Sequence, residues 1–293
     1  MIIQNYQISE MAVGMAISFL SMLLNSGSSY IVEVESAEHV LIQLKKIFNI
    51  NDKIIIKVVK QLDSNLFNEL SDVGKFTSPY FKSNFPKTKN KPYIVLAMYQ
   101  NYNHLVDYDH NDINWPNTKY RSLDEYSFLF KLIKLIGYEV ITLDNQNMSL
   151  ENKVKFLNDY VECVIGYEGG LCHIAHVLDI PCIVLPWKMP ELFLNIHSLH
   201  LDLKTWFVDD FTEILKWNES KLLSVIESCK LDQGNNIFAQ GQVTFKNDFT
   251  NYRLITNNKS YSILPMYRDF EIAFFQNNLD YQTFFGKPIV FYD

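Results

Sequence analysis

The chain has 293 residues, of which 48% are hydrophobic and 20% charged, and this length and balance predict a globular protein of two domains or one large domain. Its 33 acidic residues outnumber its 26 basic residues, so the net charge of -7 argues against a general nucleic-acid binder, which needs a basic surface. Aromatic residues make up 14% of the chain, a share that excludes an intrinsically disordered protein.

An apolar run near the N-terminus is too short to cross a membrane. Met11–Leu24 (MAVGMAISFLSMLL) has 14 residues, whereas a spanning helix needs about 20. A signal peptide carries lysine or arginine before its apolar part, and neither residue precedes this run. We therefore expect a buried helix. The absence of CxxC spacing predicts reduced, buried thiols in a cytoplasmic protein for all four cysteines: Cys163, Cys172, Cys182 and Cys229.

The N-terminal part alternates between strand-like and helix-like runs. In chain order these are Ile2–Gln4, Met11–Leu24, Tyr30–Val34, Glu38–Phe48 and Lys53–Val59. The β-α-β-α-β order predicts a parallel sheet with right-handed crossovers. The run Phe85–Pro92 (FPKTKNKP) is typical of a linker. We therefore expect a Rossmann-like first domain over residues 1–88, which borders a cleft.

The same alternation starts again after the linker. Strands are expected at Tyr93–Met98, Glu139–Leu143, Cys163–Ile165 and Cys182–Leu185, and helices at Leu123–Ile136, Leu150–Leu157 and Leu171–Leu178. This pattern predicts a second Rossmann-like domain over residues 89–234, with ligands bound outside the carboxyl ends of its strands, in the cleft between the domains. The asparagine-rich residues 235–293 predict a C-terminal extension that packs on the domains and forms either short antiparallel strands or an irregular cap.

The segment from Cys163 to Trp187 (CVIGYEGGLCHIAHVLDIPCIVLPW) carries the strongest chemical signal. Gly169 and Gly170 leave backbone N–H groups uncovered where a helix begins, and a helix N-terminus favours an anion such as a diphosphate. His173 lies in the first turn of the predicted helix and can face the cleft. His176, one turn further on, is expected to be structural.

This segment resembles the nucleotide-sugar half of GT-B glycosyltransferases, most closely the heptosyltransferase-like family that transfers from ADP-heptose. In that family a strand ends in an acidic or polar residue, followed by Thr or Gly and then Gly, a leucine, a small residue, a histidine, an Ala-rich helix and a Pro-containing strand. The residues at the matching places are Glu168, Gly169, Gly170, Leu171, His173, Ala175 and Pro181. The resemblance covers about 25 residues closely and is weaker over residues 90–190.

Two further places match the family. Glu10 stands before the apolar helix, where the family usually has its catalytic Asp, and Lys119 and Arg121 precede the Leu123 helix, where the family has a phosphate-binding basic residue. The resemblance implies a metal-independent glycosyltransferase of two Rossmann-like domains. Glu10 would deprotonate the acceptor, and the donor would be bound by Lys119, Arg121, Glu168, Gly169, Gly170 and His173. The chain departs from the pattern in having Glu rather than Asp at position 10, and Ser9 where glycine is usual.

The same resemblance implies the partners. They are a nucleotide-diphosphate sugar as co-substrate, with no separate cofactor, and a hydroxyl acceptor on a bacterial surface glycan such as lipopolysaccharide or on a lipid carrier. A homo-oligomer and peripheral contact with the inner membrane are compatible with it.

Each candidate residue also has a structural explanation. Glu10 and Glu168 can act as acids near a helix N-terminus, Lys119 and Arg121 as surface charges, and His173 as a buried histidine bonded to the backbone. The pair Asp107 and Asp109 fits the DxD pattern that binds a metal in GT-A enzymes, but a solvated loop explains it better. A zinc site from Cys172, His173 and His176 lacks a fourth ligand.

Two other functional classes stay open. Sugar-nucleotide epimerases of the 2-epimerase type share this fold and also place a glycine pair and an acid near the diphosphate. A non-catalytic relative would bind a nucleotide sugar without turning it over.

Overall fold

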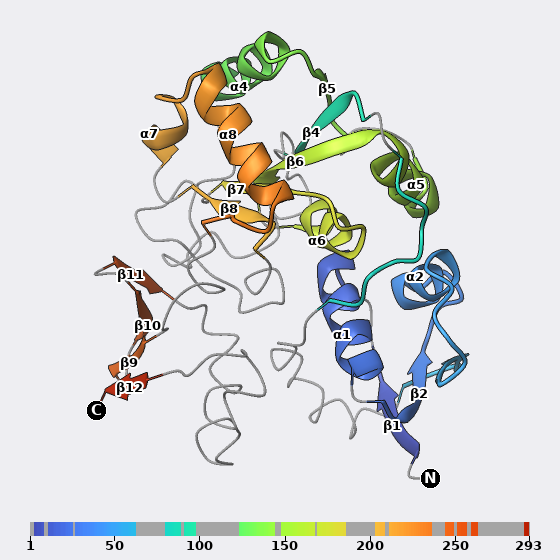
Figure 1. Cartoon of the computed structure of the whole chain (residues 1–293). Coiled ribbons are helices and arrows are strands. Elements are labelled where there is room, and N and C mark those ends of the chain that lie inside the picture. The colour runs from blue at the N-terminus through green and yellow to red at the C-terminus, as the bar shows by residue number, and fades with distance from the viewer. Residues whose placement is uncertain are drawn as a thin grey trace.

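A computed structural model describes residues 3–8, 11–25, 27–62, 80–88, 91–97, 123–143, 148–167, 169–185, 203–208, 211–235, 244–248, 251–256, 259–262 and 290–292. These residues form two parallel sheets with helices and one small, mostly antiparallel sheet (Figure 1). The predicted α/β class with parallel sheets is confirmed.

The first parallel sheet has the order β1-β2-β3, with β1 at Ile3–Gln7, β2 at Ser29–Val34 and β3 at Ile54–Val58. The connecting helices are α1, Val13–Asn25, and α2, Val40–Ile47. Burial alternates along β2, which turns Tyr30, Val32 and Val34 into the core, as the period of two in a strand requires. The apolar run that is too short for a membrane span forms α1, which confirms the expected buried helix.

The second sheet is parallel throughout and has the order β5-β4-β6-β7-β8. Its strands are β4 (Tyr93–Ala97), β5 (Glu139–Ile141), β6 (Val161–Tyr167), β7 (Cys182–Leu185) and β8 (Thr205–Phe207). The chain reverses its direction of travel across the sheet between β4 and β6. Ligands of open parallel sheets bind at such a switch point, outside the carboxyl ends of the strands.

Helices cover both faces of this second sheet. Helices α5, Leu150–Tyr160, and α6, Gly170–Val177, pack on the face that carries Val95 and Val164. The opposite face carries Ile94 and Ile165 and meets the helices α4 (Leu123–Leu135), α7 (Phe211–Ile214) and α8 (Glu219–Lys230). Apolar side chains on both faces explain why these strands are continuous hydrophobic runs rather than alternating ones.

One hydrophobic core extends from the first sheet to the second. It joins Val32 of β2 and Phe19 of α1 to Ala175 of α6 and Val184 of β7. Figure 1 shows α1 beside α6 and α2 beside α5, and both helix pairs are in contact. The two parallel sheets are therefore connected by two layers of packed helices. The domain boundaries at residues 88 and 234, and a cleft between the domains, stay predictions.

The C-terminal part forms a separate small sheet, seen at the lower left of Figure 1. Strands β9 (Thr244–Asp248), β10 (Asn251–Thr256) and β11 (Lys259–Ser262) are antiparallel, as predicted, while β12 (Val290–Tyr292) pairs in parallel with β9. Within the described ranges, no helix combines the length and the apolar character that a membrane crossing demands.

Candidate functional site

The turn between β6 and α6 lies at the switch point of the second sheet. Gly166, near the end of β6, pairs with Ala97 at the end of β4, and a methyl group at Gly166 would lie 2.6 Å from the Ala97 side chain. A glycine is therefore required for the two strands to approach so closely. Gly169 then caps α6 in extended conformation without a side-chain hydrogen bond, and the first turn of α6 carries no acidic residue. The helix thus begins with uncapped backbone N–H groups and a positive dipole end.

The N-terminus of α1 lies against the N-terminus of α6. A methyl group at Gly170 would lie 3.2 Å from Cβ of Val13, the first residue of α1. At Gly14, a methyl group would lie 2.6 Å from Nε2 and 3.1 Å from Cγ of His173. A side chain would clash at Gly14 and would be tight at Gly170, so the two glycines allow the helices to meet closely at their positive ends.

His173 is the centre of this helix contact. Its side chain is 3% exposed, one edge of the ring faces Gly14, and Nδ1 shares a hydrogen bond with the hydroxyl of Tyr80. The Tyr80 ring also meets the imidazole edge to face, with 5.8 Å between centroids. In this arrangement a donor molecule reaches His173 only if α1 and α6 separate. The predicted contact between His173 and the donor is not tested by these contacts.

His176 is packed inside the protein, as expected. It is fully buried, its Nε2 lies 3.1 Å from the Thr205 hydroxyl, and its ring lies 6.1 Å from the Tyr80 ring. Its carbonyl accepts a hydrogen bond from Lys82 at 2.9 Å. His176 therefore links α6 to β8 and to the segment that connects the two sheets.

That connecting segment, residues 80–88, runs along α6. The Ser83 amide donates to the carbonyl of Val177 at 2.9 Å, and the Phe81 amide donates to the Ser21 hydroxyl of α1 at 3.3 Å. Asn158 of α5 donates to the carbonyl of Pro86 at 3.1 Å. Residues 80–88 are thus bonded to three helices, and Pro86 lies within the run predicted as a linker.

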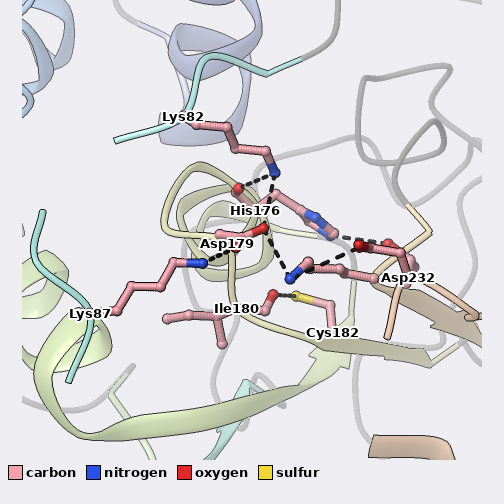
Figure 2. Close-up of polar contacts among 9 residues, drawn as sticks. Lys82, Lys87, His176, Asp179, Ile180, Cys182 and Asp232 are labelled. Carbon is pink, nitrogen blue, oxygen red and sulfur yellow. Dashed lines mark hydrogen bonds and ion pairs between the residues drawn. The ribbon is translucent and has the colours of Figure 1, made fainter. Parts of the chain in front are cut away.

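Asp179, in the turn after α6, pairs with three lysines from different parts of the chain (Figure 2). Lys87 bonds one carboxylate oxygen, while the other lies 3.1 Å from Nζ of Lys204 and 3.8 Å from Nζ of Lys82. Burial raises the pKa of Asp179, but hydrogen bonds from Lys87 and Lys204 outweigh it and leave the pKa below its ordinary value. The backbone of Asp179 is left-handed, with φ of 61°, a conformation that Asp tolerates better than most residues. This cluster joins the connecting segment to the turn between α6 and β7.

All four cysteines are free and buried, as predicted. Burial raises the pKa of the Cys163 and Cys182 thiols well above the usual value, so both are poor nucleophiles at neutral pH. In the part of the chain that the structure describes, no three His, Cys, Asp or Glu side chains come together as a metal site.

Several predicted site residues lie outside the described residues. They are the proposed base Glu10, the basic residues Lys119 and Arg121, Glu168, and the DxD pair Asp107 and Asp109. Their roles stay predictions.

The contacts of Gly14 and Tyr80 were not expected from the sequence. A glycine inside an apolar helix indicates that another part of the chain approaches closely, so the sequence could have predicted a contact at Gly14. Tyr80 lies in a stretch without periodicity, and nothing in the sequence indicates its contact with α6.

No protein-family model matches the chain, and no curated protein matches it. Among solved structures, the chain is similar to the bacterial iron-containing dodecameric glycosyltransferase TibC from enterotoxigenic E. coli H10407. The two are 13% identical with a TM-score of 0.45, and the match covers 64% of this chain and 61% of TibC. A likeness of this size does not establish a family.

Proposed function

We propose that this protein transfers a sugar from a nucleotide-diphosphate sugar to a hydroxyl acceptor. The observation that supports the proposal is the meeting of two helix N-termini, those of α1 and α6, at the carboxyl edge of the second sheet. Both ends carry a partial positive charge, and neither helix has an acid in its first turn to neutralise it. Such a place favours a ligand with a compact negative charge, as a diphosphate has.

The donor is proposed to bind with its diphosphate at the backbone N–H groups of Gly169 and Gly170, where α6 begins. Lys119 and Arg121, which lie between β4 and α4 in the sequence, would neutralise the remaining phosphate charge. Glu168 would accept hydrogen bonds from hydroxyl groups of the ribose or the sugar. Preorganised donors of this kind stabilise charge that develops on the leaving diphosphate, and this term usually supplies most of the rate.

The acceptor is proposed to enter on the side of α1, where Glu10 precedes the helix. Glu10 would take the proton from the acceptor hydroxyl as its oxygen forms a bond to the anomeric carbon. The bond from the anomeric carbon to the diphosphate oxygen breaks in the same step, and the nucleoside diphosphate leaves with both electrons. No metal is required in this scheme, since the two helix N-termini and the basic residues stabilise the leaving group.

The proposal also covers the identity of the acceptor and the role of each part of the chain. The acceptor would be a bacterial surface glycan or a lipid-linked glycan, handled in the cytoplasm or at the inner membrane. Residues 1–88 would bind the acceptor, residues 89–234 the donor, and residues 235–293 would pack on these domains or join copies of the chain.

A thermal-shift panel with ADP, UDP, GDP, CMP and TDP, each with Mg²⁺ and with EDTA, tests the proposal. A ligand at a hundred times its Kd adds about 2.7 kcal/mol of stability, which raises Tm by about 4 °C in a chain of this size. We expect one nucleotide to stabilise the protein in both Mg²⁺ and EDTA. Lys119→Ala or Arg121→Ala should weaken that shift, while Lys134→Ala, an exposed charge on α4, should not.

The outcomes separate the three functional classes. Turnover with an acceptor that is lost in Glu10→Gln, with donor binding retained, is the result expected of a transferase. Turnover of the nucleotide sugar without any acceptor would favour an epimerase. Binding that is insensitive to Glu10→Gln, without turnover, would favour a non-catalytic relative. A Tm shift that occurs only with Mg²⁺ would favour a metal bound by Asp107 and Asp109. The absence of any Tm shift would refute the proposal.

A further inference from the structure

Tyr80 contacts the proposed donor helix from outside it. It belongs to the connecting segment, is 7% exposed, and bonds through its hydroxyl to Nδ1 of His173. None of the donor-binding roles proposed above includes it. It nevertheless touches the one histidine that lies where α1 and α6 meet.

The two nitrogens of the His173 ring face different parts of the protein. Nδ1 faces Tyr80, whereas Nε2 faces the first turn of α1 at Gly14. A neutral imidazole has one N–H and one bare nitrogen, so the partner of one nitrogen decides what the other can do. A tyrosine hydroxyl can donate or accept, and if Tyr80 donates to Nδ1 then Nε2 carries the ring proton and is a donor.

The Tyr80 hydroxyl is held in place by its own neighbours. The next residue, Phe81, donates its amide to Ser21 of α1 at 3.3 Å, and Lys82 donates to the carbonyl of His176 at 2.9 Å. The Tyr80 ring packs against both histidines of α6. Because the next two residues are bonded to α1 and α6 and the ring contacts both histidines, the hydroxyl is directed at Nδ1 before any ligand binds.

We propose that Tyr80 is a positioning residue that donates its hydroxyl proton to Nδ1 of His173 and thereby fixes the Nε2–H tautomer. The inference rests on the proposed function: when a nucleotide-diphosphate sugar separates α1 from α6, the nitrogen that His173 presents is a hydrogen-bond donor. A diphosphate oxygen accepts hydrogen bonds and would be repelled by a bare nitrogen. Tyr80 thus matches His173 to an anionic ligand without touching that ligand.

Nitrogen-15 NMR of the histidine side chains tests the tautomer without any nucleotide. The chain has 7 histidines, and the His173 signals are those that disappear in His173→Asn. Wild type should show the Nε2–H tautomer alone at neutral pH. Tyr80→Phe keeps the ring packing but removes the hydroxyl, so both tautomers should then be populated. Tyr160→Phe, the same change on an exposed residue at the end of α5, should leave the His173 signals unchanged.

A double-mutant cycle tests the effect on the donor. The probe is the nucleoside diphosphate that stabilises wild type most in the thermal-shift panel, titrated by calorimetry. Tyr80→Phe should raise its Kd by about 3- to 10-fold, the change expected for one neutral hydrogen bond. In the His173→Ala background the same substitution should change Kd less than twofold, because Tyr80 acts only through that imidazole.

The results separate the inference from the function on which it rests. If no nucleotide binds to wild type, both the proposed function and the role of Tyr80 in it are refuted. If a nucleotide binds but wild-type His173 carries its proton on Nδ1, or Tyr80→Phe binds as wild type does, only the inference is refuted. The tautomer in wild type is decisive even where Tyr80→Phe does not fold.

Discussion

Gly14→Ala probes the contact between α1 and α6 with a single methyl group. The methyl would lie 2.6 Å from Nε2 and 3.1 Å from Cγ of His173, well inside contact distance. His173 is buried and bonded to Tyr80, so the ring cannot move aside freely. Overpacking of this kind costs about 1–3 kcal/mol, and the better helix propensity of Ala returns at most about 1 kcal/mol. We expect the free energy of unfolding to fall by about 1–2 kcal/mol.

The sign of the effect should reverse when the imidazole is removed. In a His173→Ala background the methyl no longer meets the imidazole, and Gly14→Ala should then raise the free energy of unfolding by about 0.5–1 kcal/mol. The three atoms nearest to that methyl all belong to His173, so a His176→Ala background should keep the destabilisation. Urea unfolding followed by circular dichroism measures each change as a shift of the midpoint at constant m. The same sign in wild type and in His173→Ala would refute the helix contact.

Three further outcomes are expected. Asp179→Asn keeps the left-handed backbone but loses the three lysine partners, so it should destabilise by about 1 kcal/mol in urea unfolding at neutral pH. Because the pKa of Asp179 is lowered in the folded state, the gap between wild type and Asp179→Asn should be constant above about pH 5 and shrink below about pH 4; a constant gap at every pH would contradict the pKa shift. Thr205→Val removes the hydroxyl bonded to buried His176 and should lower the free energy of unfolding by about 1–2 kcal/mol; an unchanged urea midpoint would contradict the bond. Glu10→Gln should abolish sugar transfer in a product assay and leave the Kd of the nucleoside diphosphate within twofold of wild type, whereas full activity would exclude Glu10 as the base.

The strands of the parallel sheets were predictable because each depends on the residue types within its own short run. The β-branched run at β3 favours a strand although only its first residue is buried, and the apolar run at β7 forms a strand that is buried throughout. Gly137, two residues after the end of α4, has a left-handed backbone with φ of 89°, as a glycine that ends a helix commonly does. Such signals depend only on neighbouring residues, so they can be read without the tertiary structure.

Other elements were missed for different reasons. Helix α8 has a helical spacing of apolar residues that was sufficient to predict it. The buried residues are Leu222, Val225, Ile226 and Cys229. Strand β8 has three residues, too few for a pattern. The parallel pairing of β12 with β9 joins segments that are distant in the chain, which no local pattern predicts.

For the candidate site, the sequence indicated the helix start but not what meets it. The glycine pair before α6 predicts uncapped N–H groups, and the structure has them. The contact of α6 with α1 depends on how two sheets with their helices pack together. That packing sets the surroundings of His173, so its bond to Tyr80 appears only in three dimensions.

The most direct test of the account is amide hydrogen exchange with and without the nucleoside diphosphate that stabilises the protein. The central claim is that the diphosphate binds where α6 begins, opposite the first turn of α1. We predict that the ligand slows exchange most in peptides covering residues 166–173 and 11–16. Slowed exchange confined to other segments, with these peptides unchanged, would contradict the claim.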